Sequence, residues 1–539
     1  MKKYYKKSDI IFSLIIFLLI LSFILLPFLA VFREAFFYDG NFSLYNFKQI
    51  LADKSLVLNT FKLGILTSLF ASFFAINVSI FYFFQKGKDR KLISIILAIA
   101  LISPPFVSSL SYITLFGRSG VISYDLLHLS VNPYGMWGIV LMQAISDLSL
   151  NSLLLIGFLN SIDKSIINSA RSIGAKTSHI IKDIILPSMK NGILAVMTLS
   201  FFRSVSDFGT PAIIGGNFRV LALESYFEVI SKGNLSLASA MNIVILIPTL
   251  ILFLFVGKGI RSGNFNTGFV SENEVPIKKK GILFNLIRII ALILILWIVI
   301  LYTSIILNAF TKKKLGNLVF TLENFSQSNK FIAPIVIRSI VYSLIAAFLA
   351  TFIGFMISYL REVRELKYMK FVDTIANLPY IIPGTFFGLG YLLFFRSPPI
   401  QITGTVAIVV LNVIFKQMPF SSRVSSAAIA EIDKNVLNSV RDLGGSSKDE
   451  IKDGVIPLSK NSIMVSLINI FTATMTTVGS IIFLIYPGQK VLTLVMFDVI
   501  QSGKYNQGSV IAFYIMLICL LFNGLVRFLF NRRRNVSRS

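Results

Sequence analysis

One polar segment occurs twice in this chain, each time between long apolar runs. The first copy, SIDKSIINSARSIGAKTSHIIKDIILPSMK, covers residues 161–190, and the second, EIDKNVLNSVRDLGGSSKDEIKDGVIPLSK, covers residues 431–460. The copies align without a gap, because Gly174 and Gly444 are 270 residues apart and so are Pro187 and Pro457. The chain is therefore expected to fold as two similar halves that each carry this segment.

Both copies have the pattern of a helix, a glycine turn and a second helix. Apolar residues recur at helical spacing in the first part of the first copy, at Ile162, Ile166, Ile167, Ala170 and Ile173, and again 270 residues further on. Gly174 and Gly444 lie where helices commonly end in a left-handed residue, and a serine or threonine follows as an N-cap. One apolar and one charged face suit an element that lies at the membrane surface and receives another protein.

The composition is that of an integral membrane protein. Of the 539 residues, 55% are hydrophobic and 14% are charged, and the mean hydropathy is +0.78, so polar side chains cannot cover the apolar surface as they do in a soluble globule. A net charge of +26 can indicate nucleic-acid binding, but the basic residues cluster in short segments between apolar runs, as cytoplasmic loops do. We therefore expect a lipid bilayer around the chain and no nucleic-acid partner.

The chain offers little for cofactor or soft-metal chemistry. Cys519 is its single cysteine, and there are two histidines, so we expect no intramolecular disulfide and no cofactor, and no metal ligands are assigned.

Twelve apolar runs are long enough to cross a bilayer, which takes a helix of about 20 residues. They lie within residues 11–32, 60–84, 92–115, 135–159, 192–214 and 238–256, and within residues 283–307, 335–360, 371–395, 405–428, 462–486 and 510–530. Six spans in each half imply two parallel repeats whose duplicated segments face the same side of the membrane. Lysines and arginines cluster on that side, which the positive-inside rule assigns to the cytoplasm together with both termini.

The predicted fold class is thus an all-α membrane protein of two six-helix repeats. We expect a first half at residues 1–257, a cytoplasmic linker at 258–282 and a second half at 283–539. The lysines at 312–314 fall on the outer side and are the exception to the charge rule.

The duplicated segment resembles the cytoplasmic EAA loop of ABC-transporter permeases of the binding-protein-dependent import type. That loop reads E-A-A, three residues, G, nine residues, I, one residue, L-P. The first copy carries Asn168 and Ser169 where the loop has its glutamate and first alanine, and matches it at Ala170, Gly174, Ile184, Leu186 and Pro187. The second keeps Gly444 and Pro457 and departs from the loop at Asn438, Ser439, Val440, Gly454 and Ile456. The resemblance implies that these residues couple the chain to an ATPase.

Over nearly its whole length the chain resembles the fused permeases of ferric-iron importers, on the strength of SARSIGA at 169–175 and SDFGTPAIIGGNF at 206–218. This implies an importer subunit in the bacterial cytoplasmic (inner) membrane that works with two cytoplasmic ATPase subunits and an external substrate-binding protein. The chain also resembles permeases for aminoethylphosphonate, thiamine and polyamines, so these compounds are alternative substrates. An ion-coupled secondary transporter is the alternative from another class.

The sequence contains no motif for ATP hydrolysis. The phosphate-binding pattern G-x-x-x-x-G-K-[S/T] is absent, and GKGIRSG from Gly257 does not have its spacing, so we expect no enzyme and a separate ATPase subunit.

Two charges in the fifth predicted span are candidate functional residues. A charge at the centre of a bilayer costs roughly 2.5–3.5 kcal/mol, and the spacing of Arg203 and Asp207 lets the two side chains face each other. We expect a mutually neutralised structural pair, with lining of the transport pathway as the alternative. Comparable candidates are Asp147, Asn151, Asn412, Lys416 and Gln417.

Overall fold

The computed structural model describes residues 7–38, 40–102, 104, 106–118, 120–129, 132–260, 281–314 and 317–536, and most of these residues are helical. Strands in these ranges form two antiparallel hairpins, β1 (Phe37–Tyr38) with β2 (Asn41–Phe42) and β3 (Thr311–Lys314) with β4 (Asn317–Phe320). Each hairpin follows the first long helix of its half of the sequence. The predicted linker at 258–282 lies largely outside the described residues.

The elements of the first half, apart from the duplicated segment, run in this order: α1 (Lys7–Ile20), η1 (Leu21–Leu25), α2 (Leu26–Phe36), α3 (Tyr45–Ala52), α4 (Lys54–Phe83), α5 (Gly87–Leu101), α6 (Val107–Phe116), η2 (Val121–Leu126), α7 (Met136–Asn160), α11 (Lys190–Ser206), α12 (Gly209–Ile214), α13 (Leu221–Ile230) and α14 (Leu235–Ile260). Those of the second half are α15 (Ile282–Phe310), α16 (Glu323–Glu362), α17 (Met369–Ala376), α18 (Leu378–Ile381), α19 (Gly384–Phe395), α20 (Val406–Ala430), α24 (Lys460–Met475), η5 (Pro487–Gln489), α25 (Leu492–Gln501) and α26 (Tyr505–Val536).

Seven of the described helices are long and apolar enough to cross a membrane, and three bent helix pairs could each form one further span. These correspond to ten of the twelve predicted spans. The remaining two predictions fall on α5 with α6, which are separate helices, and on α20, which is interrupted by polar residues. The sharpest of the three bends, 114°, separates α18 from α19 next to Pro383, a residue that has no backbone N–H to continue a helix.

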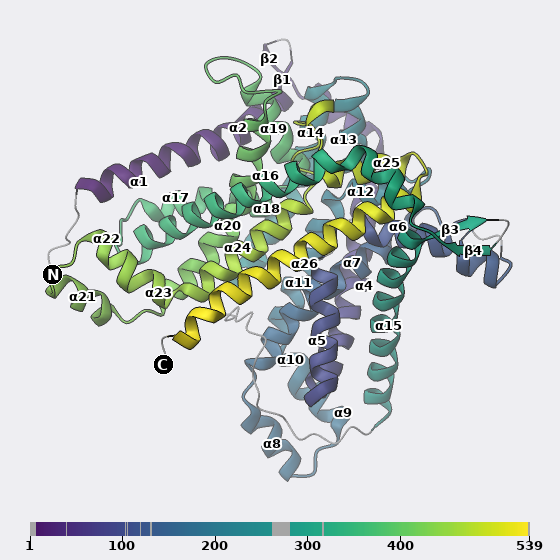
Figure 1. Ribbon diagram of the computed structural model, residues 1–539, viewed down its shortest axis with the longest axis horizontal. Coiled ribbons are helices and arrows are strands. Elements are labelled where there is room, and N and C mark those ends of the chain that lie inside the picture. Colours follow the sequence, from purple (N-terminus) through teal and green to yellow (C-terminus); the bar gives the residue numbers. More distant parts are fainter. Residues whose placement is uncertain are drawn as a thin grey trace.

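The two halves of the sequence interlock through their first helices. The continuous helix α1–η1–α2 packs against α16, α17 and α19 of the second half, and α15 packs against α4, α5 and α6 of the first (Figure 1). Aromatic rings fill the first of these interfaces, where Phe23 stacks on Phe395 and Phe415. The sequence boundary between the halves is therefore not a boundary in space.

Small residues let the long helices approach closely. A Cβ on Gly354 of α16 would lie 2.7 Å from the Cβ of Ser421 on α20, and a Cβ on Gly64 of α4 would lie 2.6 Å from Val205 Cγ1 on α11. Between membrane helices, close van der Waals packing of this kind replaces the hydrophobic drive that water supplies elsewhere.

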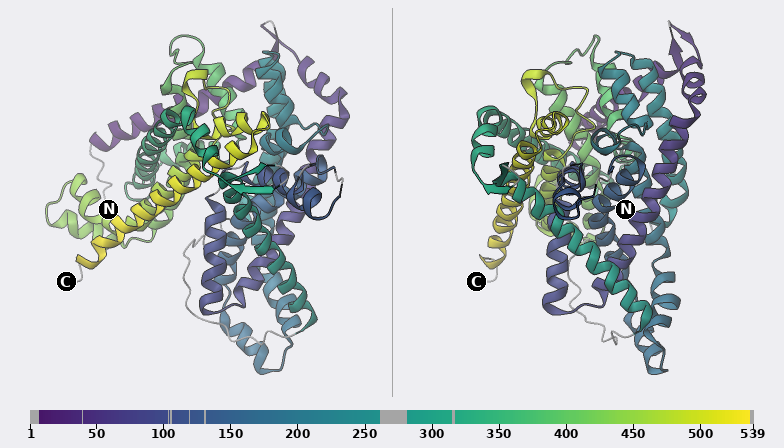
Figure 2. Two further views of the ribbon diagram at one scale, coloured as in Figure 1. Left: turned by 45° about the vertical axis from the view of Figure 1, so that its right-hand side comes forward. Right: turned by 90° about the vertical axis from the view of Figure 1, so that its right-hand side faces the viewer.

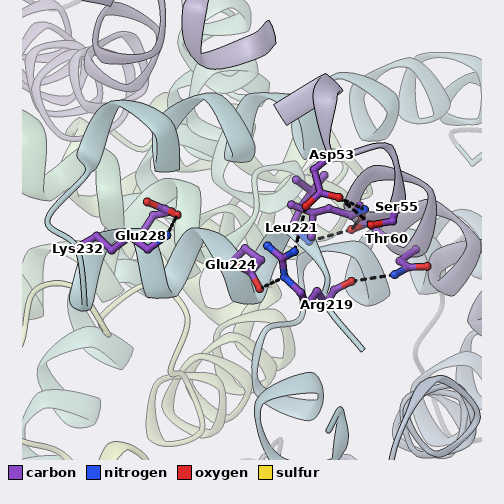
Figure 3. Close-up of polar contacts among 10 residues, drawn as sticks. Asp53, Ser55, Thr60, Arg219, Leu221, Glu224, Glu228 and Lys232 are labelled. Carbon is purple, nitrogen blue, oxygen red and sulfur yellow. Dashed lines mark hydrogen bonds and ion pairs between the residues drawn. The ribbon is translucent and has the colours of Figure 1, made fainter. Parts of the chain in front are cut away.

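One hydrogen-bonded clamp occurs in both halves, where the first residue of α13 bonds to α4 and the first residue of α25 bonds to α16. In the first half, the backbone N–H of Leu221 donates to Thr60 Oγ1 at 2.8 Å. In the second, the N–H of Leu492 donates to Ser339 Oγ at 2.9 Å. Arg219 strengthens the first clamp, because its guanidinium binds Asp53 at 3.0 Å and Glu224 at 2.8 Å (Figure 3).

Two of the three lysines that depart from the charge rule form ion pairs. Lys312 Nζ lies 3.1 Å from Glu323 Oε1, and Lys313 Nζ lies 2.8 Å from Asp125 Oδ1. They fasten the β3–β4 hairpin to α16 and η2.

The helices diverge into two arms that end in the duplicated segments. The first copy lies at the lower end of the molecule in Figure 1, and the second lies at its left, near the start of α1. The left view in Figure 2 shows the same two arms.

Candidate functional site

The two copies of the polar segment fold alike, residue for residue. The first consists of α8 (Lys164–Ser172), α9 (Thr177–His179), η3 (Ile180–Ile185) and α10 (Leu186–Ser188). The second consists of α21 (Lys434–Asp442), α22 (Ser447–Asp449), η4 (Glu450–Val455) and α23 (Ile456–Leu458), and every boundary is shifted by 270 residues. We call them the first and second docking segments. The predicted helix, glycine turn and helix are present in both.

Local hydrogen bonds explain where the first helix of each segment starts. Asp163 Oδ1 accepts the backbone N–H of Ser165 at 2.8 Å, and Asp433 Oδ1 accepts that of Asn435 at 2.9 Å. This N–H bond and the Ser165 hydroxyl lower the pKa of the exposed Asp163 carboxyl below its ordinary value, so the cap is a charged one at neutral pH.

Glycine ends the first helix of each segment. Gly174 has φ +84° and Gly444 has φ +81°, in the left-handed region that costs other residues energy. The following N–H groups then bond back to the helix, Ala175 to the carbonyl of Ala170 and Gly445 to that of Val440, both at 3.0 Å. This is the hydrogen-bond pattern of a Schellman cap.

Each first helix buries one apolar residue and exposes another. Ile167 and Leu437 are buried beneath their helices, against η3 and η4. Ile173 and Leu443, at the turns, are 87% and 90% exposed. Apolar side chains so exposed at matched positions give each segment an apolar tip that a partner can cover.

Two of the five departures of the second copy from the EAA pattern, Val440 and Gly454, pack beside each other. Where the first copy has the small Ala170 and the large Ile184, the second has the larger Val440 and Gly454. A Cβ on Gly454 would lie 3.1 Å from Leu437 Cδ2 and 3.9 Å from Val440 Cγ2, so the valine and leucine occupy the space next to this glycine. The larger valine thus offsets part of the volume that is lost where the isoleucine is replaced by glycine.

The other residues singled out in the sequence lie mostly on the surface of the docking segments. Exposed are Asn168, Ser169, Pro187, Ser439, Ile456 and Pro457, and partly buried are Ala170, Ile184, Leu186, Asn438 and Val440. The structure therefore gathers these residues into two compact elements, one for each copy.

The prediction that Arg203 pairs with Asp207 is wrong, because Arg203 has a different partner. Arg203 Nη1 binds Asp147 Oδ1 on α7 at 2.8 Å. The helix that carries Arg203 ends at Ser206, and Asp207 has an extended backbone, so the two residues are not stacked on one helix face. Asp207 instead accepts the N–H groups of Gly209 and Thr210 at the start of α12, and the side-chain amide of Gln143.

Lys416 holds a broken helix together. Its Nζ donates to the carbonyl oxygens of Pro379 at 2.6 Å and Ile382 at 2.7 Å, at the break between α18 and α19. These carbonyls lack helical partners because the chain turns away there. Asn151 has a comparable packing role, since its amide donates to Ser200 Oγ at 2.7 Å between α7 and α11. The sequence identified these polar residues but not their partners.

Within the described residues, no group of three or more His, Cys, Asp or Glu side chains is arranged to hold a metal ion.

The long apolar helices are those of a multi-pass helical membrane protein. Residues 350–535 match the family described as "Binding-protein-dependent transport system inner membrane component". This confirms the resemblance seen in the sequence.

Relatives match most of the chain. The ferric transport system permease protein FbpB of Actinobacillus pleuropneumoniae is 28% identical over 79% of this chain and 64% of its own length, so the chain spans slightly less than two thirds of that relative. A Haemophilus influenzae protein named as ferric transport system permease FbpB 1 is 29% identical over 84% of this chain and 74% of its own length. A Salmonella typhimurium protein named as a 2-aminoethylphosphonate transport permease, PhnV, is 27% identical over 29% of this chain and 59% of its own length.

Proposed function

We propose that this chain is the membrane subunit of an ATP-driven importer of ferric iron. The observation that carries the proposal is the pair of docking segments, which repeat every helix boundary and present matched apolar tips. A transporter driven by an ion gradient would not need two such surfaces. The proposed substrate, ferric iron, comes from the names of the two relatives that match most of the chain.

The proposed partners are two cytoplasmic ATPase subunits, one on each docking segment, and an external substrate-binding protein. The ATPase is separate because the sequence has no phosphate-binding loop. Closure of the ATPases on ATP would move the two docking segments and switch the helices between outward-facing and inward-facing states. The residues proposed to couple these motions are the fourteen singled out by the EAA resemblance, seven in each copy.

The proposed topology has twelve spans, with α5–α6 and α20 completing the ten supported by length and composition. The halves are residues 1–257 and 283–539, joined by the linker at 258–282, and both termini face the cytoplasm. Support comes from the equivalent order of helices in the two halves and from the basic residues on one side.

Cysteine labelling in intact cells tests this topology. An impermeant reagent should modify a cysteine at the exposed Leu318 of β4 and spare one at the exposed Lys176 of the first docking segment. The reverse pattern would overturn the proposed orientation.

Aminoethylphosphonate is the second candidate substrate, because a shorter stretch of the chain matches PhnV. Uptake of radiolabelled ferric iron, by cells that contain and cells that lack this chain, separates the two. We expect uptake to depend on the chain and to resist competition by aminoethylphosphonate. Chain-dependent uptake of aminoethylphosphonate without iron uptake would favour the second candidate.

A further inference from the structure

Three charged side chains meet in the interior beside the second docking segment. Arg364, just after α16, places Nη2 3.0 Å from Glu450 Oε2 at the start of η4 and Nε 3.3 Å from Asp9 Oδ2 on α1. The side chains of Arg364, Asp9 and Glu450 are only 6%, 9% and 1% exposed. This cluster thus joins three segments that are far apart in the sequence.

The surroundings hold the cluster in one arrangement. The Arg364 guanidinium carbon lies 5.3 Å from the centre of the Tyr359 ring, which is itself buried. One turn further along α1, the hydroxyl of the buried Ser13 contacts the hydroxyl of Tyr368. The first helix of the chain is therefore fastened at two points to the loop between α16 and α17.

The first half builds the same junction without charges. Ile180 stands 270 residues before Glu450 and is buried in an apolar cluster with Ile167 and Ile185. Aligning α4 with α16 through the clamp residues Thr60 and Ser339 places Gln85 opposite Arg364.

α2 ends at Phe36 and α15 ends at Phe310, each directly before a hairpin. Counting back the same number of residues from these two helix ends matches Leu283 with Asp9. Leu283 packs at the edge of the apolar cluster that contains Ile180, and α15 contacts α9 there. All three charged residues therefore have uncharged counterparts.

This difference matters physically because the two kinds of junction tolerate movement differently. Apolar surfaces can shift against each other with little loss, since their attraction is not directional. Buried charges are stable only while each keeps its partners, and an ion separated from them in the interior is strongly unfavourable.

We propose that Asp9, Arg364 and Glu450 form an ionic latch that positions the second docking segment and makes it move with α1 as one body. Within the described residues, the first docking segment has uncharged residues at the three matched positions and packs against an apolar cluster. The two docking segments are then inequivalent. The second transmits the motion of its ATPase directly to α1, the helix of the first half that packs against the second half. This consequence for transport rests on the proposed function, whereas the latch itself does not.

The test measures local opening of each docking segment in the purified chain without partners. Cysteines replace Val455 in η4 or Ile185 in η3, two fully buried residues at matched positions, in a Cys519→Ser background. The rate of maleimide labelling reports how often each segment opens. Glu450→Gln should raise the rate at position 455 by about tenfold or more and leave the rate at position 185 unchanged.

Two further variants make the result specific. Glu365→Gln breaks the exposed ion pair with Lys434 on the same docking segment and should change neither rate. The triple variant Asp9→Leu, Arg364→Gln, Glu450→Ile installs the residues of the first half and should return labelling at position 455 to the slow rate.

The proposal is overturned if Glu450→Gln labels no faster than the parent, if both cysteines speed up alike, or if the triple variant stays fast. Since no ATPase or iron is present, these outcomes are independent of whether the chain imports iron.

Discussion

Removing the apolar tips of the docking segments should weaken ATPase binding without weakening the fold. Ile173 and Leu443 are 87% and 90% exposed in the chain alone, so replacing either by serine removes almost no internal contact. If an ATPase covers the tip, each substitution forfeits the burial of one large aliphatic side chain, about 1.5–3 kcal/mol. At 1.4 kcal/mol for each factor of ten, the dissociation constant should rise by about 10- to 150-fold at the altered segment.

The assay is binding of the purified ATPase subunit to the chain in nanodiscs, with the melting temperature of the chain measured in parallel. Leu318→Ser is the matched control, because Leu318 is an exposed apolar residue on the β3–β4 hairpin, away from both docking segments. Ile173→Ser and Leu443→Ser should each weaken one of two binding events, and the double variant should weaken both. Wild-type affinity in the double variant, with unchanged melting temperature, would refute the assignment of the tips as the contact.

Three further outcomes follow from the local geometry. Gly174→Ala meets no steric obstacle but places an alanine at φ +84°, a strain of about 1–2 kcal/mol, so ATPase binding should weaken by about 5- to 30-fold. Gly174→Asn should retain most of the ATPase binding. Equal losses of binding in the two variants would contradict the role of the turn. Arg203→Gln should lower the melting temperature more than Asp147→Asn does. Arg203→Gln leaves the Asp147 carboxylate, which is 6% exposed, without its ion pair, whereas Asp147→Asn leaves unpaired an arginine that is 48% exposed. The opposite order of melting temperatures would contradict the argument. The pKa of Asp53 is lowered from 3.8, chiefly by the Ser55 hydroxyl, so the charged carboxylate adds stability above about pH 4 that is lost as the pH falls further. The difference in unfolding free energy between the parent and Asp53→Asn should therefore shrink between about pH 5 and pH 3. A difference that stays constant over this range would exclude the effect.

The sequence predicted the features that depend on local spacing. Helical periodicity, the two glycines and the constant offset of 270 residues define the docking segments because each signal lies within a few turns of chain. The membrane environment follows from long apolar runs in the same way. The left-handed conformation of Gly174 and Gly444 was expected from their place at the end of a periodic pattern, and the structure has it.

Features that depend on packing between distant segments were not predictable from the sequence. The partner of Arg203 is decided by where α11 ends and by the approach of α7, so a rule for neighbours on one helix chose Asp207 instead of Asp147. The contacts of Asp9 with Arg364 and the crossing of the first helices between the halves bring together residues hundreds of positions apart. The exchange of Ile180 for Glu450 between the two copies can be read from their alignment, but neither the burial of Glu450 nor its partner Arg364 can.

Transport by the purified components tests the central claim most directly. The chain is reconstituted in proteoliposomes with its ATPase inside and the substrate-binding protein loaded with ferric iron outside. The account predicts that iron accumulates only when ATP and all three components are present, and that the Ile173→Ser, Leu443→Ser double variant abolishes most of this uptake. Accumulation by the chain alone, driven by an ion gradient and indifferent to ATP, would contradict it.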